Sequence, residues 1–260
     1  MLDYLDIEKL KEITHLAGQE VLDVYGGDFA VDEKEDQSPL TEADRRANAV
    51  ILEELQQAFP GVPFVSEETR AMPYEERKNW EYLWLIDPLD GTKEFVKRNG
   101  EFTVNIALVR NGVPVAGVVY QPTEQRMYYA MEGCGAFRQD EKGEPSRLSS
   151  GPSYRDRTVD PVKVVASRSH LSEAVTDFVK ALEEEGRAVE FMSSGSSLKL
   201  CLVAEGAAHV YPRLAPTMEW DTAAAHAVVI EAGKQVLEFE TGKALGYNKE
   251  DLLNPWFVVE

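Results

Sequence analysis

Residues 84–95 read WLIDPLDGTKEF, and this stretch decides how the rest of the chain is interpreted. The apolar run at 82–86 is typical of a buried strand and ends at Asp87. Asp87 and Asp90 lie three residues apart around a proline-stiffened turn, so their carboxylates can face one region with the Leu89 carbonyl between them. Mg²⁺ prefers oxygen ligands of this kind and keeps several of its waters. An exposed turn in which aspartate caps the chain explains the pattern equally well.

Gly91 and Thr92 follow directly and add two features that a ligand site can use. Glycine allows the backbone to approach a ligand closely. The threonine hydroxyl can orient a water. An Asp-Gly turn is nevertheless common, so the other acidic segments of the chain have to be considered with it.

Three further segments place carboxylates at the ends of predicted elements. Glu67 and Glu68 follow a short predicted strand, Asp44 stands in a capping-box pattern at the start of a helix, and Asp221 immediately precedes an alanine-rich helix. Each also has a purely structural explanation. The two glutamates can be a solvated loop end, and the two aspartates can cap helices. Neither explanation excludes a metal.

The apolar periodicity predicts a mixed α/β chain of layered sheets and helices. Helices are expected from Leu10 to Val24 and from Thr41 to Leu55, and Asn111-Gly112 is a strong hairpin signal. Strands are expected at 62–66, 82–86, 102–109, 113–120 and 125–130, and strand-like and helical patterns alternate at 162–166, 171–185, 198–204, 207–211 and 222–232. The polar stretch 142–161 suggests one boundary, between an N-terminal half at 1–150 with most candidate ligands and a C-terminal half at 151–260 with Asp221, packed as one unit.

Composition narrows the classes of partner. The 260 residues carry a formal net charge of −19, which argues against nucleic-acid duplexes as partners because such binding relies on a basic face. Bound divalent cations would still let an acidic protein handle a small phosphorylated substrate.

No apolar run approaches the roughly 20 residues that cross a bilayer, and no signal peptide is evident, so a cytoplasmic protein is expected. Cys134 and Cys201 are expected to be buried apolar residues.

Four separated motifs give the chain a family resemblance. The stretch at 84–92 and the segments Leu40–Asp44, Val65–Glu68 and Glu219–Ala224 resemble the inositol monophosphatase superfamily in wording, order and spacing. The resemblance covers nearly the whole chain and implies a layered α/β sandwich like that of the inositol monophosphatases and fructose-1,6-bisphosphatases. Within it, residues 90–95 resemble the branch of bacterial 3'(2'),5'-bisphosphate nucleotidases, since inositol monophosphatases usually have Asn where Glu94 stands.

The resemblance also implies a role for each motif residue. The ligands of a site for two or three Mg²⁺ ions are then Glu67, Asp87, the Leu89 carbonyl, Asp90 and Asp221. Glu68 contributes through a water, and Asp44 and Thr92 form the pair that activates the attacking water. The substrate phosphate is expected against Glu67, Leu89, Asp90, Gly91, Thr92 and Asp221. The four histidines show no metal-ligand spacing, and none is assigned to the metal.

Substrate choice is expected to depend on the second half of the chain. Residues 195–199, GSSLK, open a predicted helix, and Ser196 and Lys199 there could hold a second phosphate. The alternative is an ordinary serine-capped helix with an exposed lysine. Similarity to the nucleotidases adds Ser167, His170 and Arg213 as candidates around a nucleoside.

The sequence therefore predicts a Mg²⁺-dependent phosphomonoesterase that hydrolyses 3'-phosphoadenosine 5'-phosphate to AMP and phosphate, clearing a by-product of sulfate assimilation. One alternative is an inositol-phosphate or sugar-phosphate phosphatase, and convergence of Ser196, Lys199 and Arg213 about one nucleotide length from the metals would discriminate against it. Another is a non-catalytic regulator that binds metal or a phosphometabolite, although such a protein has no need of Asp44 and Thr92.

Related bacterial enzymes are sometimes attached loosely to the inner membrane, but no basic amphipathic helix supports such anchoring here. The sequence does not indicate the oligomeric state.

Overall fold

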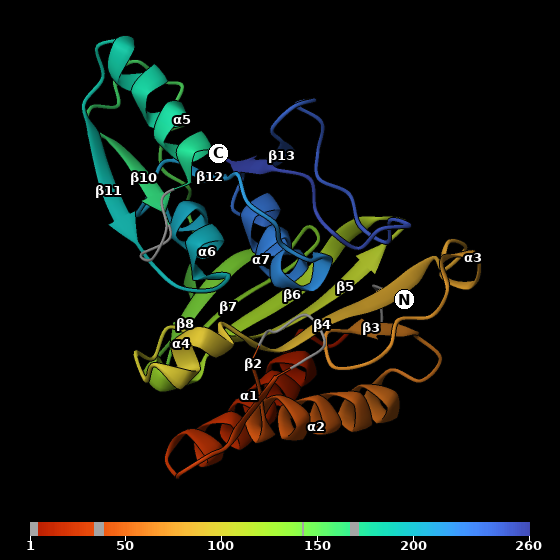
Figure 1. The fold of residues 1–260 in the computed structure, drawn as a ribbon. Helices are drawn as coiled ribbons and strands as arrows, with labels where there is room; N and C mark the ends of the chain where they lie inside the picture. Colours follow the sequence, from red (N-terminus) through yellow and green to blue (C-terminus); the bar gives the residue numbers. More distant parts are fainter. Residues whose placement is uncertain (1–4, 34–38, 142, 167–171) are drawn as a thin grey trace.

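The computed structural model describes residues 5–33, 39–141, 143–166 and 172–260, which form alternating layers of helices and sheets (Figure 1). In chain order the elements are α1 (Ile7–Tyr25), β1 (Val31–Glu33), β2 (Pro39–Thr41), α2 (Glu42–Ala58), β3 (Phe64–Ser66), α3 (Tyr74–Arg77), β4 (Tyr82–Asp90), α4 (Thr92–Val96), β5 (Thr103–Arg110), β6 (Val113–Gln121), the 3₁₀ helix η2 (Pro122–Glu124), β7 (Arg126–Met131), β8 (Gly135–Asp140), β9 (Ser146–Arg147), β10 (Val162–Ala166), α5 (Glu173–Glu184), β11 (Val189–Ser193), α6 (Leu198–Ala204), β12 (Tyr211–Arg213), α7 (Glu219–Glu231), β13 (Val236–Glu238) and β14 (Phe257–Val259). The predicted layered α/β fold is confirmed.

The largest sheet has seven strands in the order β3-β4-β5-β6-β7-β8-β9. The strands β3 and β4 run parallel, and all the other neighbouring pairs in this sheet run antiparallel. Side chains in β4 alternate between two cores because successive residues of a strand point to opposite faces. Leu83 and Leu85 belong to one buried cluster, and Trp84 and Ile86 belong to the other. A strand buried on both faces explains the continuous apolar run at 82–86.

The helices α1 and α2 cover one face of this sheet (Figure 1). Leu10 and Ile13 of α1 and Ile51 of α2 are fully buried there, as the helical spacing of the apolar residues predicts. The helix α1 ends at Tyr25 with Gly26 as its C-cap, and α2 begins after Thr41, whose hydroxyl accepts a hydrogen bond from the Ala43 N–H at 3.2 Å. Both predicted helices are confirmed.

The helices α6 and α7 cover the opposite face and separate the large sheet from a second sheet region (Figure 1). The helix α7 packs very closely on β6 at Gly117. A Cβ at this position would lie 2.3 Å from the Ala224 carbonyl oxygen, so the close approach requires glycine. Beyond α6 lie the parallel pair β10-β11 and the sheet β12-β14-β13, with α5 packed against β11 and β12. One buried cluster takes residues from both sides of residue 150, and the boundary there stays a prediction.

Several local expectations can be compared directly. The hairpin is confirmed, with Asn111 at φ 49° and Gly112 at φ 79° between β5 and β6. The strand β11 was not predicted, because its residues are mostly exposed and show no apolar pattern. Cys201 is buried as expected, but Cys134 is exposed, because it lies in the turn between β7 and β8. Over the described residues, no helix combines the length and apolarity needed to cross a membrane.

Candidate active site

Two parallel strands bring candidate ligands of the first half to one edge of the large sheet. The backbone N–H of Glu67 donates to the Ile86 carbonyl at 3.2 Å, which places Glu67 beside Asp87 of β4. Asp87 is 1% exposed, and the pairing of β4 with β5 shifts register between Asp87 and Asp90. The prediction that the strand ends at Asp87 is therefore wrong, because this irregularity accommodates Pro88 and pairing resumes at Asp90.

The turn after β4 is fixed by hydrogen bonds within the motif. The Leu89 N–H donates to Asp87 Oδ1 at 3.1 Å, and Thr92 Oγ1 donates to the Leu89 carbonyl at 3.2 Å. Gly91 has φ 89°, and a Cβ there would lie 3.1 Å from the Glu101 carbonyl oxygen. A side chain at this position would be strained and crowded, so the turn depends on glycine.

Asp90 is held by groups from the neighbouring strand β5 and from the start of α6. The Ser197 N–H donates to Asp90 Oδ2 at 2.6 Å, and Asn105 Nδ2 and Thr103 Oγ1 lie 3.4 Å and 3.5 Å from the same oxygen. Ser197 Oγ in turn donates to Asn105 Oδ1 at 2.9 Å. Sequence reasoning missed these three residues, although buried polar side chains at 103 and 105 in an otherwise apolar strand were a usable signal.

Asp221 is the third residue of α7 and not its N-cap. The explanation of Asp221 as the N-cap of this helix is therefore wrong. The helix begins two residues earlier, at Glu219, and Asp221 Oδ2 accepts a hydrogen bond from the Met218 N–H at 2.9 Å. Glu219 is fully buried and accepts from the Asn248 N–H and from Lys249 Nζ, both at 2.6 Å. These bonds fix the start of α7 and hence the position of Asp221.

Asp44 is the third residue of α2 and forms the predicted capping box. Its Oδ2 accepts from both the N–H and the hydroxyl of Thr41 at 2.7 Å, and its side chain is 1% exposed. The helix α4, which Thr92 opens, contacts the strand β2 that leads into α2. The structure therefore places the segments of the proposed water-activating pair against one another.

The carboxylates destabilise one another's charged forms. Burial and then the charges of Glu67, Asp90 and Asp221 raise the pKa of Asp87 well above its ordinary value. Burial raises the pKa of Asp90 to about 6, although the charge of Lys199 lowers it. Burial, followed by the charge of Asp90, raises the pKa of Asp221 to about 8. Mutual repulsion shows that these four acids share one region.

This donor set fits a divalent cation. Mg²⁺ prefers oxygen ligands, and carboxylates supply them together with negative charge. A bound cation would offset the repulsion between the carboxylates and so lower the free-energy cost of ionising them. Within the described part of the chain, no three Asp, Glu, His or Cys side chains are already drawn together closely enough to hold an ion. The acids are therefore grouped electrostatically rather than clustered at ligand distances.

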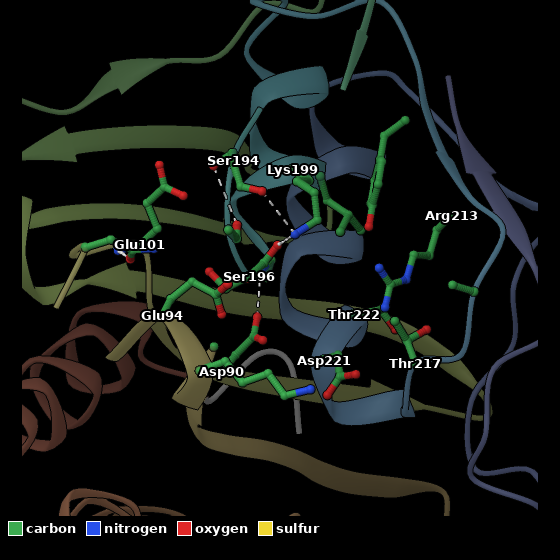
Figure 2. Close-up of a pocket in the computed structure, with 18 of the residues that line it drawn as sticks. Asp90, Glu94, Glu101, Ser194, Ser196, Lys199, Arg213, Thr217, Asp221 and Thr222 are labelled. Atoms are coloured by element: carbon green, nitrogen blue, oxygen red, sulfur yellow. Dashed lines mark hydrogen bonds between the residues drawn. The ribbon is translucent and has the colours of Figure 1, made fainter. Parts of the chain in front are cut away.

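A cavity of about 520 Å³ opens beside Asp90 and Asp221. Figure 2 shows these two acids facing the same space as Lys199 and Arg213, which come from α6 and β12. Ser196 also lines the cavity. The structure thus brings Ser196, Lys199 and Arg213 together next to two proposed metal ligands.

The basic end of the cavity is built from buried groups. Lys199 is 7% exposed, its Nζ donates to the Ser196 carbonyl at 2.7 Å, and burial lowers its pKa to about 8. Ser197 makes no side-chain cap, so this segment is not an ordinary serine-capped helix with an exposed lysine. Ser196 Oγ and Arg213 Nε are both buried without a hydrogen-bond partner among the described residues. Unpartnered donors lining a cavity are available to a ligand.

The remaining candidates are less central. Glu68 follows β3, and its N–H donates to Ser66 Oγ at 3.3 Å. Ser167 and His170 lie outside the described residues. Lys93 and Lys97 also line the cavity and were not singled out from the sequence, where lysines in a charged segment give no specific signal. The role of each predicted site residue stays a prediction.

Comparison with known proteins agrees with the motifs. The model of the inositol monophosphatase family matches residues 5–258. The chain belongs to the inositol monophosphatase family. The family resemblance read from the four motifs is thereby confirmed, and the fold is that of solved inositol monophosphatase family members. One is CysQ from Bacteroides thetaiotaomicron, with a TM-score of 0.85 and 46% identity over 97% of this chain and 96% of that one. Another is an inositol monophosphatase from Thermotoga maritima, with a TM-score of 0.77 and 26% identity over 99% and 92%.

Within the inositol monophosphatase family, the chain is similar to curated nucleotidases over almost its whole length. The 3'(2'),5'-bisphosphate nucleotidase CysQ of Salmonella typhimurium is 44% identical over 97% of this chain and 98% of its own length. The protein of the same name from Escherichia coli K12 is 43% identical with the same coverage.

Proposed function

We propose that this chain is a Mg²⁺-dependent phosphomonoesterase that hydrolyses 3'-phosphoadenosine 5'-phosphate to AMP and phosphate, and so removes a by-product of sulfate assimilation. Membership of the inositol monophosphatase family supports a metal-dependent phosphatase. Nearly full-length similarity to proteins named 3'(2'),5'-bisphosphate nucleotidase supports the substrate.

The division of charge in the 520 Å³ cavity carries this proposal. At one end, Asp90 and Asp221 would hold Mg²⁺ together with Glu67, Asp87 and the Leu89 carbonyl. Lys199 and Arg213 face the same space, and Glu94 and Glu101 line another part of its wall. A substrate with two phosphates matches such a cavity, because one phosphate can lie at the metal end while the other pairs directly with the basic end.

Bound Mg²⁺, as two or three ions, would lower the pKa of a water and neutralise charge on the transferred phosphate. The protein's own contribution is to place that water. Thr92 Oγ1 donates a hydrogen bond to the Leu89 carbonyl at 3.2 Å, which leaves its lone pairs to accept a hydrogen bond from the water. The Asp44 carboxylate, fixed by its two bonds from Thr41, would orient the water and take its proton.

The second phosphate would be held at the basic end of the cavity. Lys199 Nζ and the unpartnered donors Ser196 Oγ and Arg213 Nε are available for its oxygens. Lys199 is already anchored on the Ser196 carbonyl, so little side-chain entropy is lost when the phosphate binds. Selectivity for a bisphosphate over a monophosphate then follows from interactions that a monophosphate cannot make.

Replacing Lys199 with Met tests this assignment. We expect KM for 3'-phosphoadenosine 5'-phosphate to rise by about 10- to 100-fold, while KM for adenosine 3'-phosphate changes by less than about threefold. Lys234→Met is the matched control, because Lys234 is also 7% exposed and donates to the Pro152 carbonyl away from the cavity. Equal effects of Lys199→Met on both substrates would show that Lys199 does not bind the second phosphate.

A further inference from the structure

A groove of about 700 Å³ lies between α2 and the edge strand β3 and shares no lining residue with the active-site cavity. Its walls are mainly apolar side chains, which include Leu52, Leu55, Phe59, Phe64, Met72 and Trp80. Phe64 and Met72 are 40% and 45% exposed. Large apolar side chains that line a concave surface and stay this exposed are typical of a binding site.

Trp84 gives the groove a buried hydrogen-bond donor. Its side chain lines the groove and is 1% exposed, and the indole Nε1 has no hydrogen-bond partner among the described residues. The Phe59 ring packs against the indole with centroids 5.4 Å apart. Most buried indole N–H groups find a partner, so a ligand that offers an acceptor would supply the interaction that the protein does not.

Arg70 gives the same groove a positive charge. Its side chain is exposed, and within the described part of the chain its guanidinium makes no hydrogen bond or ion pair. An unpaired arginine is notable in a chain whose formal net charge is −19. A partner that combines an apolar body with an acidic group would complement both the walls and this charge.

We propose that this groove binds a small amphiphilic anion, an aromatic or acyl molecule that carries one carboxylate or sulfonate. Its apolar body packs between α2 and β3, its acid group pairs with Arg70, and an oxygen or aromatic face accepts the Trp84 N–H. The proposal concerns the groove alone and does not depend on the phosphatase assignment.

The probe for this site is 8-anilinonaphthalene-1-sulfonate, which has the required aromatic body and single acid group. Its fluorescence would be titrated with the full chain and with the variants Arg70→Gln and Trp84→Phe. We expect saturable one-site binding that weakens by about tenfold in Arg70→Gln and by about threefold in Trp84→Phe. The matched controls are Arg157→Gln and Trp256→Phe, which change an exposed arginine and a 42% exposed tryptophan outside the groove and should bind as the native chain does.

Competition with unlabelled molecules shows which apolar body the groove prefers and whether it recognises the acid group. Decanoate or 1-naphthoate should displace the probe, and the more effective of the two shows whether the groove prefers an acyl or an aromatic body. Uncharged decanol should compete at least about tenfold less well. Unchanged binding in both variants, displacement by decanol as effective as by decanoate, or displacement by AMP would each overturn the proposal, because the probe would then bind elsewhere or without recognition of its charge.

Discussion

Replacing Asp90 with Asn should stabilise the metal-free protein at pH 8 while it abolishes turnover. Burial raises the folded-state pKa of Asp90 from 3.8 to about 6, so the folded state holds this proton more tightly than the unfolded chain does. Stability from this group is therefore fully present below pH 3.8 and is lost as the pH rises through about 6. Asparagine keeps an oxygen that can accept the Ser197 N–H but carries no charge.

The size of the effect follows from the shift. Two pKa units correspond to about 3 kcal/mol at roughly 1.4 kcal/mol per unit. Because Asp90 lines a cavity that water can enter, screening reduces this, and a gain of roughly 1–2 kcal/mol in the free energy of unfolding is expected.

Urea denaturation in chelator at pH 5 and pH 8 measures the gain. The variant should exceed the native chain at pH 8 and approach it at pH 5, and added Mg²⁺ should stabilise the native chain more than the variant. Asp140→Asn is a control of opposite sign. Burial raises the pKa of Asp140, but hydrogen bonds from Arg138 and Arg126 outweigh it and lower the pKa overall, so this variant should lose stability at pH 8. A metal-free Asp90→Asn that is less stable than the native chain at pH 8, or an unchanged rate at saturating Mg²⁺, would refute the reasoning.

Two further substitutions separate water activation from the geometry of the turn. Asp44→Asn should lower kcat by about 100-fold or more with little change in the Mg²⁺ concentration that gives half-maximal rate, because Asp44 is assigned to the water and not to the metal; a shifted Mg²⁺ requirement at unchanged kcat would contradict this. Thr41→Ala is its comparison, since it removes the cap and one of the two bonds to Asp44 but keeps the carboxylate, and it should cost about 1 kcal/mol in urea unfolding and lower kcat much less than Asp44→Asn does. Gly91→Ala should destabilise the fold and lower kcat, because alanine is strained at φ 89° and its Cβ would lie 3.1 Å from the Glu101 carbonyl oxygen. Native unfolding and activity in this variant would show that the turn tolerates a side chain.

Much of the fold could be predicted because its signals are local. The capping box of Thr41 and Asp44 and the turn at Asn111-Gly112 each depend on a few adjacent residues, and the structure contains both. The strands β13 and β14 were missed because each has only three residues and β14 pairs with segments far away in the sequence. Continuation of β4 past a proline was missed because a register shift depends on the partner strand.

The metal ligands of the candidate site could be predicted from the sequence, but the residues that hold them in place could not. Asp87 and Asp90 were recognised because the wording of the motif coincides with the end of the apolar run at 82–86. The support of Asp90 by Ser197 was not, since this bond joins residues 107 positions apart. The role of Glu219 in fixing α7 was missed for the same reason, because its partner Lys249 comes from a distant loop.

Phosphate release from 3'-phosphoadenosine 5'-phosphate, inositol 1-phosphate and fructose 1,6-bisphosphate, each with Mg²⁺ and with chelator, tests the central claim most directly. The account predicts Mg²⁺-dependent release with a kcat/KM for the nucleotide at least about tenfold higher than for either alternative, or about 1.4 kcal/mol of differential transition-state binding. A preference for inositol or sugar phosphate would contradict the assigned pocket, and no release from any substrate would contradict the assignment as an enzyme.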